Sequence, residues 1–79
     1  MGQADMITVE YPTMNIILNG TARDVPDKLS ASELLLSLDL AGKRLALEVN
    51  QEIIPRSSFD SYTINPGDKV EIVHAIGGG

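Results

Sequence analysis

The residues with the clearest chemical potential lie at the end of the chain, which finishes with Gly77, Gly78 and Gly79. A glycine lacks a Cβ atom, so three in a row can pass through a channel that would exclude any side chain. At roughly 3.3 Å per extended residue, they carry the final carboxylate about 10 Å beyond Ile76. The spacing predicts a flexible tail that delivers this carboxylate into the active site of a partner enzyme.

A glycine run at a terminus also has a simpler interpretation. Chain ends are often disordered without any function, and a cloning remnant has the same appearance. A delivered tail differs from a frayed end because it needs a compact domain that holds it out in solvent. The rest of the sequence must therefore be examined for such a domain.

The composition excludes several other kinds of chemistry. The 79 residues include no cysteine and one histidine, so the sequence offers no disulfide, thiolate site or multi-histidine metal site. His74 could act as a switch or a base, but no Asp or Ser partner is evident, and we expect an ordinary strand residue. No P-loop and no nucleophile–base pair are visible. We therefore expect a protein that enzymes act on, with no bound cofactor or metal.

The net charge and the hydropathy pattern narrow the possible partners. A formal charge of −5, with six basic residues scattered along the chain, argues against nucleic acid, because phosphate contacts need clustered Lys and Arg. No apolar run approaches the about 18 residues that span a bilayer. Residues 1–13 lack the basic start and apolar centre of a signal peptide. The expected location is the cytoplasm, without membrane attachment.

The length of the chain allows one domain with a helix and a small sheet. We expect residues 14–76 to form this domain, residues 77–79 to form the tail, and residues 1–13 to form a flexible leader. Residues 7–11 alternate like a strand before Pro12, so an added strand at a sheet edge is the alternative for the leader.

The first half of the domain predicts a hairpin followed by a helix. Asn19 and Gly20 tolerate positive φ at both centres of a two-residue turn, which joins strands at 14–19 and 21–25. Ser30 and Glu33 have capping-box spacing, so the helix is expected to begin there. Gly42 is expected to close the helical region. The apolar side chains expected in the core are Ile16, Leu18, Val25, Ala31, Leu34, Leu35 and Leu38, with Leu36 off this face and exposed.

The second half predicts three more strands. Alternating apolar residues indicate a strand at 45–49, and a short strand at 53–54 is ended by Pro55. Residues 65–68 have the Pro and Gly positions of a type II turn, and the last strand, at 69–75, leads directly into the tail. Further apolar anchors are expected at Phe59, Tyr62 and Ile64. In the last strand, Val70 and Ile72 are expected to face the core and Glu71 and Val73 the opposite side.

This order of elements describes a fold class. A strand, a strand, a helix, a strand, a short strand and a final strand are typical of an α+β protein of the β-grasp type. Such a fold has a mixed sheet of four to five strands packed on one main helix. Other small α+β layouts share the same order and stay open at this point.

Several stretches of the sequence resemble the ThiS family of sulfur carriers. They are residues 14–20 (MNIILNG), 47–56 (LEVNQEIIPR), Phe59, residues 66–73 (PGDKVEIV) and the final two glycines. The similarity covers residues 14–79, and the leader is a departure from it. The family requires only the last two glycines, so Gly77 is an addition.

The resemblance implies more than the residues alone. It implies a ubiquitin-like β-grasp fold and a thiocarboxylate on Gly79 that donates sulfur for thiazole formation in thiamine biosynthesis. It also implies a ThiF-like adenylating enzyme that uses ATP and Mg²⁺, and a ThiG-like thiazole synthase that receives the sulfur. The chain would then be a protein cosubstrate and not an enzyme.

Two other functions remain as alternatives. A MoaD-like carrier for molybdopterin synthesis shares the fold, the tail and the thiocarboxylate, although the short helix and the segment Ile54, Pro55 and Arg56 favour ThiS. From a different class, a β-grasp interaction module would bind partners through its sheet, and its tail would have no role.

A flexible tail contributes little binding enthalpy by itself, so the body of the domain must dock to place the carboxylate reproducibly. We expect the partner interface on the sheet surface beside the root of the tail, at Val73, Ile76 and Arg56. The alternatives are that Val73 is buried within the sheet and that Arg56 is a solvated turn charge.

Overall fold

A computed structural model describes residues 12–74 of the chain. The leader up to residue 11, Ile76 and the glycine tail therefore lie outside the described residues. The elements are β1 (Thr13–Leu18), β2 (Thr21–Pro26), α1 (Ala31–Ser37), β3 (Leu45–Val49), β4 (Glu52–Ile54), the 3₁₀ helix η1 (Arg56–Ser58) and β5 (Lys69–His74). The order of the strands and of α1 agrees with the order predicted from the sequence, whereas η1 was not predicted.

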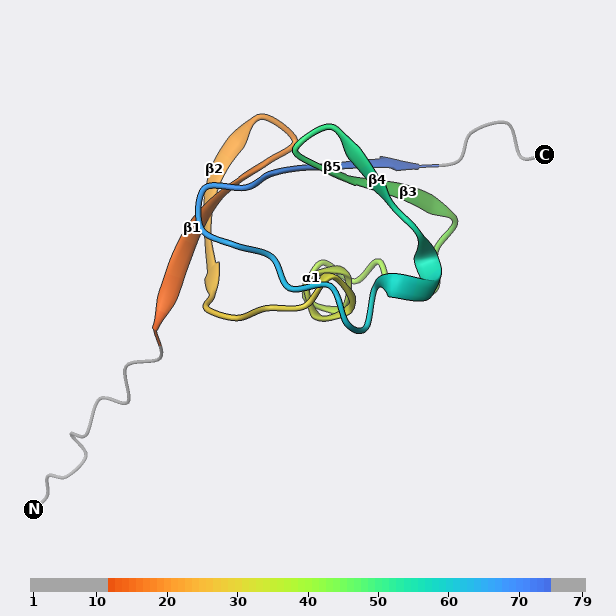
Figure 1. The fold of residues 1–79 in the computed structure, drawn as a ribbon, viewed down its shortest axis with the longest axis horizontal. Helices are drawn as coiled ribbons and strands as arrows, with labels where there is room; N and C mark the ends of the chain where they lie inside the picture. Colours follow the sequence, from red (N-terminus) through yellow and green to blue (C-terminus); the bar gives the residue numbers. More distant parts are fainter. Residues whose placement is uncertain (1–11, 75–79) are drawn as a thin grey trace, which may run out of the picture.

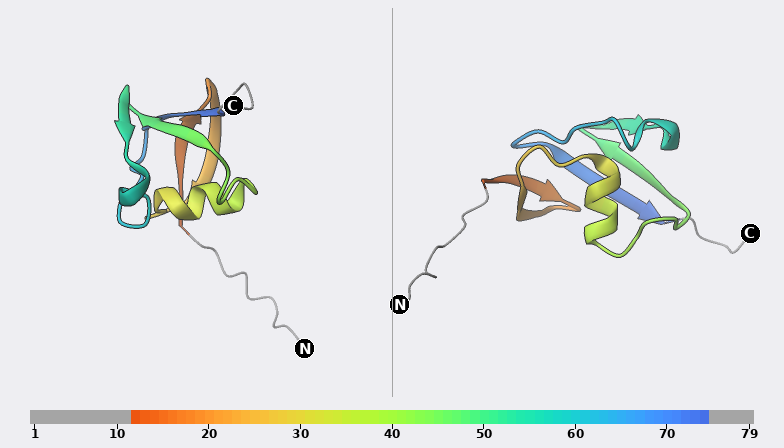
Figure 2. Two further views of the ribbon diagram at one scale, coloured as in Figure 1. Left: turned by 90° about the vertical axis from the view of Figure 1, so that its right-hand side faces the viewer. Right: turned by 90° about the horizontal axis from the view of Figure 1, so that it is seen from below.

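The five strands form one mixed sheet in the order β2-β1-β5-β3-β4. The pairing of β1 with β5 is parallel, and the other three pairings are antiparallel. In Figure 1 the sheet forms one layer, and α1, seen end-on, lies beneath it. Figure 2 shows from two further sides that α1 covers one face of the sheet only. The opposite face is not covered by any described element.

The hairpin that opens the fold was predicted correctly. Asn19 and Gly20 have φ angles of 49° and 84°, the positive values that a tight two-residue turn between twisted strands requires. Leu18 pairs with Thr21, and the ladder runs back to the pair of Thr13 with Pro26. A proline cannot donate a ladder hydrogen bond, so β2 ends at this residue.

The capping box at the start of α1 is present as predicted. The Ser30 Oγ accepts a hydrogen bond from the Glu33 backbone nitrogen at 3.0 Å, and Glu33 Oε1 accepts one from the Ser30 nitrogen at 2.9 Å. Ala31, Leu34 and Leu35 are buried, and Leu38 packs against the core from its edge. Leu36 is 69% exposed, which confirms its position off the buried face.

The predicted end of the helix was wrong. The helix ends at Ser37, five residues before Gly42. Asp39 takes the left-handed conformation with φ of 62°, its nitrogen donates to the Leu36 carbonyl, and the Leu40 nitrogen donates to the Leu35 carbonyl. These two bonds form a Schellman motif, which closes the helix with an aspartate where a glycine is usual. Gly42, with φ of 79°, lies in the next turn.

The core lies between the helix and the inner face of the sheet. Its members alternate along the strands, and Phe59 and Ile64 are added by the segment between η1 and β5. The turn before β5 has Gly67 with φ of 81° directly after Pro66, as the predicted turn type requires. The buried residues are Met14, Ile16, Leu18, Val25, Leu29, Ala31, Leu34, Leu35, Leu47, Val49, Ile54, Phe59, Ile64, Val70 and Ile72. In the part of the chain that the structure describes, no helix has the length and apolarity to cross a bilayer.

Candidate functional site

Strand β5 sets the position from which the C-terminal tail departs. It pairs with β1 at its beginning and with β3 along most of its length. The pairing with β3 continues to the end of the strand, where Ala46 faces Val73 and Leu45 faces His74. The last described residue before the tail is therefore held in a hydrogen-bonded sheet.

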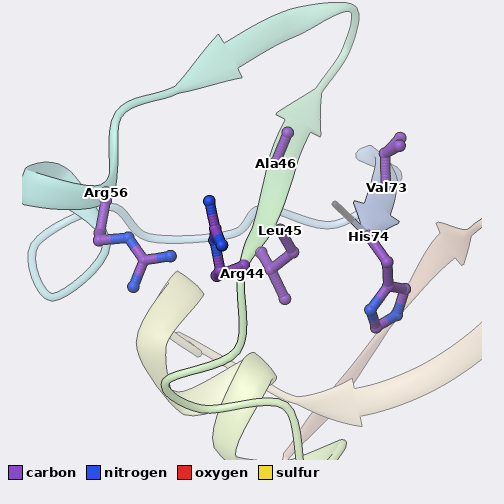
Figure 3. A pocket seen from close by; sticks show the side chains of 6 residues that line it. All are labelled: Arg44, Leu45, Ala46, Arg56, Val73 and His74. Atoms are coloured by element: carbon purple, nitrogen blue, oxygen red, sulfur yellow. The ribbon is translucent and has the colours of Figure 1, made fainter. Parts of the chain in front are cut away.

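An open pocket of about 400 Å³ lies beside this root. We call it the root pocket, and its lining residues are Arg44, Leu45, Ala46, Arg56, Val73 and His74. In Figure 3 the two arginine side chains lie on one side of β3, and Val73 and His74 lie on the other. The pocket thus joins the start of β3, the end of β5 and the start of η1.

Val73 occupies the exposed face of the sheet. Its side chain is 52% exposed, whereas Val70 and Ile72 on the same strand are buried. Because successive residues of a strand point to opposite faces, burial of Val70 and Ile72 directs Val73 away from the helix. The alternative of burial within the sheet is wrong. Whether a partner contacts Val73 stays a prediction.

Arg56 is exposed, but its side chain is held by a hydrogen bond. Its Nη2 donates to the backbone carbonyl of Lys43 at 3.1 Å, which links the start of η1 to the segment before β3. Pro55, in extended conformation, precedes it and ends β4. Arg56 therefore presents a partly oriented positive charge to the root pocket.

Two of the three predicted interface residues, Val73 and Arg56, line the same pocket. The third, Ile76, lies outside the described residues, as do Gly77, Gly78 and Gly79. That Ile76 belongs to the partner interface and that the three glycines form the sulfur-carrying tail stay predictions.

Sequence reasoning missed that basic residues gather at this site. The six basic residues looked scattered, yet Arg44 and Arg56 share the root pocket with His74. They are brought together by the pairing of Leu45 with His74 and by the bond from Arg56 to Lys43. A sequence signal existed only for Arg44, which directly precedes the predicted strand at 45–49.

Two acidic residues lie next to this pocket on the exposed face of the sheet. Glu48 and Glu71 face each other across the ladder of β3 and β5, and Ile53, which is 68% exposed, pairs with Glu48 on the other side. Among the described residues, no cluster of three or more histidine, aspartate or glutamate side chains can hold a metal ion. The described residues beside β5 therefore form an open surface with apolar and charged parts.

The fold defines a class of protein, the ubiquitin-like β-grasp domain, and its last strand, β5, precedes the terminal glycines in the sequence. The crystal structure of the thiamine biosynthesis protein ThiS from Geobacter metallireducens superposes with a TM-score of 0.74 at 36% sequence identity. The match covers 84% of this chain and all of that chain. It confirms the predicted fold class.

The sequence comparisons place the chain within that class. The family model described as "ThiS family" matches residues 16–79. The sulfur carrier protein ThiS of Escherichia coli is 32% identical over 66 residues, which cover 84% of this chain and the whole of that protein. A thiazole synthase of Paramagnetospirillum magneticum is 39% identical over 66 residues, and the chain spans a fifth (20%) of that relative's length. The chain belongs to the ThiS family.

Proposed function

We propose that this chain is a sulfur carrier of thiamine biosynthesis and that the carboxyl group of Gly79 carries the sulfur as a thiocarboxylate. The single observation that supports this most is the ThiS family match, which runs to residue 79 and so includes the terminal glycines. The Escherichia coli relative that is covered completely is named a sulfur carrier protein. The chain serves as a protein cosubstrate and not as a catalyst.

The chemistry follows from the weakness of a carboxylate as an electrophile. Sulfur cannot displace a carboxylate oxygen until that oxygen becomes part of a good leaving group. An adenylating enzyme of the ThiF type supplies this by joining Gly79 to the AMP part of ATP, with Mg²⁺ in its own active site. The outer sulfur of a persulfide then attacks the acyl carbon and AMP leaves, which gives an acyl disulfide. A second thiol of the partner enzyme cleaves the S–S bond, so that Gly79 keeps the thiocarboxylate and the two remaining sulfurs form a disulfide. The carrier contributes only the acyl group and binds no cofactor itself.

A thiazole synthase is the proposed acceptor of the sulfur. Relatives from Paramagnetospirillum magneticum and Magnetococcus marinus that are named thiazole synthase contain a region similar to this chain within a much longer protein. A carrier and an acceptor that occur in one chain act at short range from each other. This supports the same pairing between separate proteins, with cytoplasmic enzymes as partners.

The exposed face of the sheet supports docking of the domain body. Val73 and Ala46 form an exposed apolar pair next to the tail root, and Arg56 adds a charge at the edge of the same pocket. We propose that partner enzymes contact this surface together with Ile76. The docked body then places the tail in the active site with a smaller loss of entropy.

The proposal is tested by the intact mass of the protein isolated from its native cells. We expect a fraction heavier by the difference between one sulfur and one oxygen atom, located on Gly79 by fragmentation. A variant with one residue appended after Gly79 must show no such fraction, because its glycine carboxyl group is an amide. The same loading in the extended variant, without trimming, would contradict the proposal.

The acceptor reaction separates the alternatives. A loaded carrier that forms thiazole with the thiazole synthase supports the thiamine pathway, and transfer only to a molybdopterin precursor would indicate a MoaD-like carrier. An interaction module without a functional tail predicts that deletion of Gly78 and Gly79 leaves activity intact. We expect that deletion to abolish sulfur loading and to leave the fold unchanged.

A further inference from the structure

We infer that the root pocket binds a carboxylate side chain on an acidic segment of the thiazole synthase. The identity of this enzyme rests on the proposed function. The chemical class of the ligand is inferred from the residues that line the pocket.

The charge of the root pocket is opposite to that of the whole chain. The chain has a formal charge of −5, yet Arg44, Arg56 and His74 line the pocket, and none of the described lining residues is acidic. Guanidinium groups present paired N–H donors whose spacing matches the two oxygens of a carboxylate. Two arginines without an acidic neighbour in the lining are therefore suited to an external carboxylate.

The positions of the two arginines are set by the fold. Arg44 directly precedes the first residue of β3, and Arg56 is tied to the Lys43 carbonyl. Both arginine side chains are therefore attached to backbone that is already ordered. This lowers the conformational entropy that is lost when a ligand binds. Figure 3 shows both side chains on the same side of β3.

The remaining lining favours a ligand that is part of a protein. Leu45, Ala46 and Val73 supply an apolar surface, of which Ala46 and Val73 are exposed. A carboxylate with an apolar neighbour in sequence matches both parts of the pocket. Nucleic acid does not, because Glu48 and Glu71 lie further along the same sheet face and would repel successive phosphates.

The same two glutamates restrict where the partner's acidic residue can sit. Like charges brought together at an interface are costly, so a partner carboxylate fits at the root pocket and not beside Glu48 and Glu71. Binding at this point fixes the register of the docked domain. His74 lies three positions before Gly77, the first residue of the tail, so this anchor is close to the tail in the sequence.

The thiazole synthase is the partner for which the relatives provide an argument. Two proteins of that name carry a region like this domain in the same chain, at 39% and 32% identity. Surfaces of the domain and the synthase are thus held near each other in those proteins. An acidic segment on the synthase next to its sulfur-accepting site is the occupant that we assign to the root pocket.

The test is a set of charge reversals in the full-length chain. Arg44→Glu and Arg56→Glu change the pocket, and Arg23→Glu is the matched control, since Arg23 is exposed on the edge strand β2, with β1 and β5 between it and β3. Titration calorimetry measures the Kd of each variant for the thiazole synthase from the same genome, and circular dichroism checks the fold. We expect both pocket variants to weaken binding about tenfold or more and the control to stay within about twofold. A neutral Arg44→Gln variant should lose less than Arg44→Glu, and raised salt should narrow the difference.

Several results would overturn the inference. They are pocket variants that bind like Arg23→Glu, equal weakening by all three reversals, and a wild-type chain that does not bind the thiazole synthase. A loss confined to the adenylating enzyme would assign the pocket to that partner instead. Failure here is distinguishable from failure of the proposed function, because the mass of Gly79 from native cells reports sulfur loading independently of docking.

Discussion

Asn50 and Asp68 join two turns at the same end of the sheet. The Asn50 Nδ2 donates to Asp68 Oδ1 at 3.0 Å, and Asp68 Oδ2 accepts from the Asn65 backbone nitrogen at 2.8 Å. On its other side, Asn50 Oδ1 accepts from the Lys69 nitrogen at 3.0 Å. Asp68 is 8% exposed, and among the described residues no other charged side chain is buried. The turn between β3 and β4 is thereby linked to the turn that starts β5.

This link leads to a prediction for stability. Asp68→Ala removes the acceptor of two hydrogen bonds and leaves the Asn65 nitrogen without its partner, so we expect a loss of about 1 to 3 kcal/mol in the free energy of unfolding. Asp24→Ala is the control, because Asp24 is exposed and accepts one exposed bond from Asn15. Its loss should be about 0.5 kcal/mol or less. Urea denaturation measures both, and equal losses would contradict a structural role for Asp68.

Truncation of core leucines should destabilise the domain strongly. Leu35 and Leu47 are 4% and 0% exposed, so replacement of either by alanine leaves a cavity between helix and sheet. We expect a cost of roughly 2 to 5 kcal/mol, which is enough to unfold so small a domain. Leu36→Ala is the same substitution at an exposed position and should cost about 0.5 kcal/mol or less. A loss below about 1 kcal/mol at both core sites would show that the burial is misassigned.

Alanine in the tail should affect activation and not the fold. Gly78→Ala or Gly79→Ala adds a methyl group where the partner's channel must close on bare backbone, so adenylation should fall sharply while the melting temperature stays unchanged. Gly77→Ala is the control, since within the tail the resemblance to the family rests on the final two glycines only. Its adenylation should fall less. Pyrophosphate release with the adenylating enzyme measures the effect, and full activity of both variants would refute it.

A charge on the exposed sheet face should weaken docking without unfolding the domain. Val73 is 52% exposed, so Val73→Asp removes an apolar contact at the proposed interface and buries little charge in the fold. Leu36→Asp, on the helix, is the control at an exposed leucine. We expect Val73→Asp and Ile76→Asp to bind both partner enzymes more weakly than the wild-type chain. The control should bind them with unchanged affinity. Folded variants with wild-type affinity would remove this surface from consideration.

The stability of the domain should fall at alkaline pH because of Tyr62. Burial raises the pKa of its hydroxyl group, and the negative charges of Asp68 and Glu52 raise it further. The folded state then holds the phenolic proton more tightly than the unfolded chain, whose tyrosine pKa is about 10. The contribution of protonated Tyr62 to the free energy of unfolding is complete below about pH 10. It is lost as the pH rises through the pKa of Tyr62 in the folded state. Tyr62→Phe should reduce this loss, measured as melting temperature against pH, and an unchanged profile would contradict it.

The local elements were predictable from the sequence because their causes are local. The turn at Asn19 and Gly20 depends on two residues that accept positive φ, and the start of α1 depends on Ser30 and Glu33. Strand faces follow from alternation, which correctly placed Val70 and Ile72 inward and Val73 outward. The end of α1 was missed because an aspartate, Asp39, took the left-handed position that the pattern assigned to Gly42.

The sequence by itself determined the order of the elements, the faces of the strands and the resemblance to the ThiS family, because each depends on the types of residues that are close together in the sequence. Only the tertiary structure determined that the root pocket exists and which residues line it. Arg44, Arg56 and His74 are separated by 12 and 18 positions, and they meet through the pairing of β3 with β5 and the bond from Arg56 to Lys43. Contacts of this kind depend on register and on side-chain packing between distant segments, which no local pattern of residues specifies.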